Sequence, residues 1–131
     1  MKKIIPHVTV AGCKEAIEYY QSILGGNIQR TQLADGIEMF KGHEGKYIHA
    51  ELHFDNGFMI YFNDVFGHEP IIGSNIEIGL ELDSDEEIEQ IFGALAEQGT
   101  IKMELQTTFW GARYGKVKDK NGITWELNFQ Q

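Results

Sequence analysis

The chain has 131 residues, of which 42% are hydrophobic, enough for one domain or two tightly fused halves with a buried core. Its formal net charge of −9 opposes phosphate polyanions, and no lysine- or arginine-rich run offsets that charge locally, so we expect neither nucleic acid nor membrane as a partner. The single cysteine, Cys13, cannot form an internal disulfide and suits the reducing cytoplasm, where we expect the protein.

The first half begins with a predicted strand and helix. Residues 4–10 are rich in β-branched side chains and fit a strand better than a signal peptide. Apolar residues then recur at helical spacing from Cys13 to Leu24, until two glycines stop the pattern. Residues 47–55 alternate between apolar and polar side chains, and the turn sequence Asp-Asn-Gly predicts a hairpin with a second strand at about 58–63.

The second half repeats this order of strand and helix after a linker at residues 67–74, which contains a proline and two glycines. Residues 76–82 alternate as a strand. Ser84 and Glu87 form an S-x-x-E capping box, and the helix that it begins keeps an apolar face until Gly99.

Short motifs occur in the same order in both halves. The matching pairs are EAIEYY (15–20) with EEIEQI (86–91), GGNI (25–28) with QGTI (98–101), and NGFMIYFN (56–63) with NGITWELN (121–128). We therefore predict an α+β fold, a single domain made of two βαβββ modules at residues 1–66 and 75–131.

Strand residues alternate between two faces, so the sequence shows which side chains lie on the face away from each helix. The side chains on that face are consistently polar. Trp125 is expected on the apolar side, in the core. If the two sheets face each other, the polar side would line a cavity. The polar positions are His7 and Thr9 in the first strand, Glu77, Gly79 and Glu81 in the fifth, and Thr124, Glu126 and Asn128 in the eighth.

The duplication, the helix EAIEYYQSILGG, the strand IHAELHF and the ending FWGARYGKVKDKNGITWEL resemble the vicinal oxygen chelate superfamily and, within it, the PhnB-like branch. The superfamily includes glyoxalases, bleomycin resistance proteins and extradiol dioxygenases. The resemblance implies curved sheets around a cup-shaped cavity. Members of the branch often carry a methyltransferase label, which we discount because no glycine-rich loop follows a strand here.

The resemblance also implies a metal site, because metal-dependent members take ligands from the first and last strands of each half. These positions correspond to His7, Tyr61, Glu77 and Glu126. Three of them, His7, Glu77 and Glu126, could hold one divalent metal such as Zn, Mn, Fe or Ni, with Glu77 or Glu126 moving protons in catalysis. The alternative is a pocket that binds its ligand with no metal.

Further candidates for substrate binding lie beside these positions. His49 shares one strand face with Glu51 and His53, but neighbours on that face are about 7 Å apart, too far to converge easily on one ion, so substrate or dimer contacts are favoured for His49. Arg113 could anchor an anionic group or form a structural salt bridge. The remaining candidates are Tyr61, Phe62, Trp110 and Tyr114.

Two functions follow from these expectations. One is a metal-dependent lyase or isomerase that acts on a small oxygenated substrate. The other is a binding protein that sequesters a small molecule, as antibiotic-binding relatives do. A third possibility is a domain selected only for assembly. A homodimer is expected in each case, because each open sheet has an edge to cover.

Overall fold

The computed structural model describes residues 1–131 and divides them into two compact units, Met1–Ile71 (unit 1) and Ile72–Gln131 (unit 2). The division falls within the predicted linker, 67–74. Each unit is described by itself. None of the helices has the length and hydrophobicity needed to cross a membrane.

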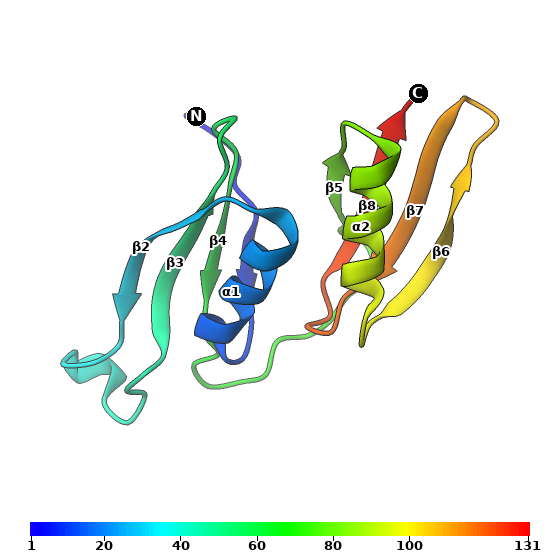
Figure 1. The fold of residues 1–131 in the computed structure, drawn as a ribbon. Helices are drawn as coiled ribbons and strands as arrows, with labels where there is room; N and C mark the ends of the chain where they lie inside the picture. Colours follow the sequence, from blue (N-terminus) through cyan, green and yellow to red (C-terminus); the bar gives the residue numbers. More distant parts are fainter. The chain divides into compact units, whose positions relative to one another are not determined.

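Unit 1 is a four-stranded sheet with one α-helix on one face (Figure 1). The strand order is β1-β4-β3-β2, with β1 parallel to β4 and the other pairs antiparallel. The elements are β1 (His7–Thr9), α1 (Cys13–Leu24), β2 (Asn27–Leu33), the 3-10 helix η1 (Glu38–Phe40), β3 (Tyr47–His53) and β4 (Met59–Asn63).

Unit 2 has the same architecture in the same order, β5-β8-β7-β6, again with the first strand parallel to the last. The α+β class and the duplicated βαβββ modules are therefore confirmed. The elements are β5 (Ile78–Glu81), α2 (Asp85–Ala96), β6 (Thr100–Thr107), β7 (Ala112–Lys118) and β8 (Thr124–Gln130).

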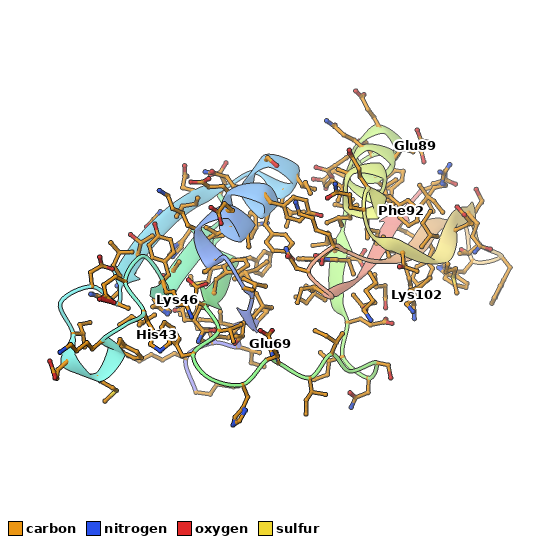
Figure 2. The ribbon with its side chains drawn as sticks, turned by 90° about the horizontal axis from the view of Figure 1, so that it is seen from below. His43, Lys46, Glu69, Glu89, Phe92 and Lys102 are labelled. Atoms are coloured by element: carbon orange, nitrogen blue, oxygen red, sulfur yellow. The ribbon has the colours of Figure 1, made fainter.

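Each helix buries its apolar stripe against its own sheet. In α1 the buried side chains include Ile17 and Tyr20, and the helix ends at Gly25, whose φ of 80° suits glycine. In α2 the predicted capping box forms: the backbone N–H of Glu87 donates to the Ser84 hydroxyl at 3.0 Å. Phe92 points from α2 toward the sheet and is buried there (Figure 2).

A buried aspartate ties the start of α1 to the strands of unit 1. Asp64, 4% exposed, accepts hydrogen bonds from the backbone N–H of Cys13 at 3.0 Å and of Tyr47 at 2.7 Å, one on each carboxylate oxygen. Burial and the Asp64 charge raise the pKa of the Cys13 thiol to about 12. Cys13 is therefore a packing residue at neutral pH.

The chain leaves α2 through a close backbone contact. A Cβ added at Gly99 would lie 2.8 Å from the Leu95 carbonyl oxygen and against the Lys118 carbonyl oxygen. Neither oxygen can rotate away as a flexible side chain would, so this position requires glycine. Gly93 differs, because it is exposed within α2 and an added Cβ there would meet no atom within 4 Å.

We expect Asp64→Asn to lower the free energy of unfolding by about 1–3 kcal/mol, because an amide offers one oxygen where two backbone N–H groups need acceptors. Urea denaturation followed by circular dichroism measures this. Asp55→Asn, in an exposed turn, is the matched control and should change stability little. Equal stability of both variants would contradict the structural role of Asp64.

We expect Gly99→Ala to destabilise the protein by about 1–3 kcal/mol, because the new methyl group collides with backbone oxygens. Gly93→Ala should stabilise it by about 0.5–1 kcal/mol, since glycine in a helix interior costs backbone entropy. The same denaturation measurement compares the two. A Gly99→Ala variant as stable as Gly93→Ala would show that the close contact is absent.

Candidate functional site

The predicted polar positions of unit 1 form a row across the sheet face that α1 does not cover. In the strand register Glu51 of β3 lies opposite Tyr61 of β4, and Tyr61 lies opposite His7 of β1. Because paired residues of neighbouring strands share a face, these three side chains are neighbours. The structure thus brings together His7, Tyr61 and the His49 face predicted for substrate contacts.

A buried carboxylate holds two histidines of this row. Glu51, 5% exposed, accepts a hydrogen bond on each oxygen, from His49 Nε2 at 2.7 Å and from His53 Nε2 at 2.6 Å. Burial alone would raise the pKa of Glu51, but the hydrogen bonds and charges of the two histidines outweigh it and lower that pKa. The three residues bind one another instead of converging on an ion.

His7 lies at the other end of the row, close to two rings. Its ring centroid is 6.0 Å from those of His49 and Tyr61, both in edge-on geometry. Partial burial and the charge of His49 lower the pKa of His7. The neutral imidazole, the form that can accept a hydrogen bond, is therefore favoured near neutral pH.

Unit 2 carries an ion pair on the equivalent face. Lys116 Nζ of β7 lies 3.1 Å from Glu77 Oε1 and 3.2 Å from Glu77 Oε2, and both side chains are about a quarter exposed. Lys116 lies opposite Glu126 of β8 in the register. The hydrogen bond to Glu77 raises the pKa of Lys116 despite its burial, so the ammonium form is stabilised.

Tyr114 precedes Lys116 by two residues and shares its face. Tyr114 interacts electrostatically with Glu126 of β8. Burial first, and then the negative charge of Glu126, raise the pKa of Tyr114, which keeps the hydroxyl protonated at neutral pH. Glu77, Glu126, Tyr114 and Lys116 thus form one connected polar group.

An open pocket of about 660 Å³ lies beside this group, entirely within unit 2. Three rings form one part of its wall, with Trp110 4.9 Å from Phe109 and 5.9 Å from Tyr114 between ring centroids. Trp110 is half exposed. The lining residues are Met103, Gln106, Thr107, Thr108, Phe109, Trp110, Tyr114, Lys116 and Glu126.

Two predicted substrate-binding residues lie on the helix-covered faces instead. Phe62 is 1% exposed and stacks on Tyr20 of α1 at 5.5 Å, on the opposite face of β4 from Tyr61. Arg113 pairs with Glu89 of α2 at 3.3 Å and with Asp85 at 3.9 Å, so the salt-bridge alternative describes its position; Figure 2 labels Glu89 on the helix. Strand alternation explains both placements, because each residue adjoins a tyrosine that faces the open side.

The register also shows that His7 and Glu77 are not equivalent positions of the duplication. His7 lies opposite Tyr61, whereas the residue opposite Glu126, the repeat counterpart of Tyr61, is Gly79. Glu77 lies two residues before Gly79, so its counterpart in unit 1 is the apolar Ile5. The two modules do not supply matching ligands from their first strands.

These observations do not fit a divalent metal in unit 2. Both oxygens of Glu77 are engaged by the Lys116 ammonium, and Glu126 lies opposite the same lysine in the strand register. A cation beside the carboxylates opposes a second cation. Within either unit, no group of three or more His, Cys, Asp or Glu side chains is placed to hold a metal ion.

Sequence reasoning missed Lys116, which contacts Glu77 and lines the pocket. The signal was present, since Lys116 lies at even spacing from Tyr114 on a strand expected to pair with the one that carries Glu126. The bridging role of Glu51 was missed for a different reason. Only side-chain geometry distinguishes three residues that bind each other from three that share a ligand.

Comparison with known proteins places this geometry in a family. Residues 4–127 match the model of the Glyoxalase/Bleomycin resistance protein/Dioxygenase superfamily. Protein YjdN of Escherichia coli (strain K12) is 30% identical over 138 residues, which cover 94% of this chain and 92% of that protein. An uncharacterized Mycobacterium tuberculosis protein, Rv0887c, is also 30% identical and is covered over 71% of its length.

Solved structures of similar fold support the same family. Protein PA1353 from Pseudomonas aeruginosa is 31% identical with a TM-score of 0.88, and the match covers 100% of this chain and 99% of that one. A Bacillus cereus structure described as a putative 3-demethylubiquinone-9 3-methyltransferase, PhnB protein, is 27% identical with a TM-score of 0.84, over 98% and 99% of the two chains. The chain therefore belongs to the glyoxalase/bleomycin resistance protein/dioxygenase superfamily.

Proposed function

We propose that this chain is a small-molecule-binding protein that holds an aromatic ligand with a neutral oxygen substituent in the unit 2 pocket. The observation that carries the proposal is the pocket itself, which combines three aromatic side chains and Met103 with the Lys116 ammonium and the Glu126 carboxylate. Its volume of about 660 Å³ is in the range typical of small-molecule sites.

The ligand class follows from the lining. Trp110, Phe109 and Tyr114 offer ring faces and edges for stacking against an aromatic molecule. Lys116 is a hydrogen-bond donor, which suits a carbonyl or hydroxyl oxygen. A fully anionic ligand is disfavoured, because Glu77 and Glu126 outnumber Lys116 in this polar group and the chain carries a net charge of −9.

A metal-dependent lyase or isomerase is the other function that the family suggests. That chemistry requires Glu77 and Glu126 to be available as ligands. The ion pair between Glu77 and Lys116 favours metal-free ligand binding instead. The proposed function therefore includes no metal-dependent step, and it includes no methyl transfer, since no glycine-rich loop follows a strand.

Saturation-transfer difference NMR with aromatic ketones and phenols, including acetophenone and 2-naphthol, tests this function. We expect binding to the wild type and about five- to tenfold weaker binding to Trp110→Ala, which removes one wall of the pocket. Phe58→Ala is the control, because Phe58 is an exposed aromatic residue in unit 1. Absence of binding across the series, or equal weakening by both substitutions, would show that this pocket is not the ligand site.

A further inference from the structure

We propose that Lys116 is the resident cation of the unit 2 polar group: its ammonium takes the place of a divalent metal and donates a hydrogen bond to an oxygen of the bound ligand. The first part stands on the ion pair of Lys116 with Glu77 and on the position of Lys116 opposite Glu126 in the strand register. The second part rests on the proposed function, because it requires a ligand in the pocket.

The position of Lys116 supports the first part. Its Nζ approaches both Glu77 oxygens, at 3.1 and 3.2 Å, and its β7 position lies directly opposite Glu126 on β8. Of the two carboxylates that the family pattern would offer to a metal, Glu77 is thus paired with this ammonium and Glu126 lies opposite it in the register. Both partners of the ion pair are about three-quarters buried, which reduces the screening of their interaction by solvent.

The strand register supports it independently. Metal-dependent members need ligands from the first and last strands of both modules. Here the first-strand candidates are not matched: the unit 2 counterpart of His7 is Gly79, and the unit 1 counterpart of Glu77 is Ile5. An isoleucine side chain has no donor atom. Unit 2 therefore offers a cation only the two carboxylates Glu77 and Glu126, whose negative charge the Lys116 ammonium partly neutralises.

The number of donors supports the second part. A lysine ammonium has three N–H groups, and the two Glu77 oxygens accept at most two of them at these distances. Lys116 also lines the pocket beside Tyr114 and Glu126. A ligand oxygen there can receive the remaining N–H group, the contact that a metal would otherwise make with it.

Isothermal titration calorimetry of tag-free protein with Zn²⁺, Mn²⁺ and Ni²⁺ chlorides tests the first part. The variant Lys116→Met keeps the length of the side chain and removes the charge. Lys118→Met is the matched control, since Lys118 lies on the same face of β7 opposite Thr124, where no carboxylate faces it. A double variant, Lys116→Met with Glu77→Gln, shows whether any gained affinity uses Glu77.

We expect no saturable metal binding by the wild type or Lys118→Met at concentrations up to about 100 μM, a gain of at least about tenfold in Lys116→Met, and loss of that gain in the double variant. Equal metal affinity of Lys116→Met and the wild type would overturn the proposal. Stoichiometric metal binding by the wild type that Glu77→Gln abolishes would also overturn it, and this arm needs no Lys116 variant to fold.

Acetophenone and ethylbenzene, which differ in the carbonyl oxygen, test the second part by the same NMR method. We expect acetophenone to bind the wild type about five- to tenfold more tightly, and this preference to disappear in Lys116→Met but not in Lys118→Met. A preference that persists in Lys116→Met would overturn the oxygen contact. The metal titration does not require a ligand in the pocket. If the proposed function is wrong, the titration still tests the role of Lys116 beside Glu77.

Discussion

The parallel pairing between the first and last strands of each unit determines which side chains can meet on the open faces. In unit 1 this pairing places His7 beside Tyr61, and in unit 2 it places Gly79 beside Glu126. The antiparallel neighbours then add Glu51 to one row and Lys116 to the other. The polar rows that cross the strands on the open faces depend on this alignment, because residues of neighbouring strands interact mainly with those beside them.

On both open faces, a partly buried charged group lies beside groups that can bind it by hydrogen bonds or opposite charge. Glu51 has two histidines, and Lys116 has Glu77 and Glu126. On the covered faces, helix packing provides most of the stabilisation and Asp64 satisfies two backbone N–H groups. On each sheet, a few polar residues are thus held by specific hydrogen bonds or ion pairs.

Much of the fold could be predicted because periodicity reports burial directly. Helical spacing and two glycines located α1, and alternation placed Trp125 in the core, where it is 2% exposed. The same alternation separates Phe62 from Tyr61 and Arg113 from Tyr114, so those placements were accessible from sequence. The register was not. A shift by two residues leaves the alternation unchanged, so the pattern alone could not tell whether His7 or Ile5 is the counterpart of Glu77.

Glu51 and Lys116 occupy corresponding positions of the duplication, one opposite Tyr61 and the other opposite Glu126. A buried acid flanked by bases in one module thus corresponds to a base flanked by acids in the other. The two modules have the same topology, but the central charged residue is negative in unit 1 and positive in unit 2. Their open faces are therefore not interchangeable. A chain of two first modules would have no central ammonium, and a chain of two second modules would have no imidazole pair. The duplication is therefore symmetric in its topology and asymmetric in its electrostatics.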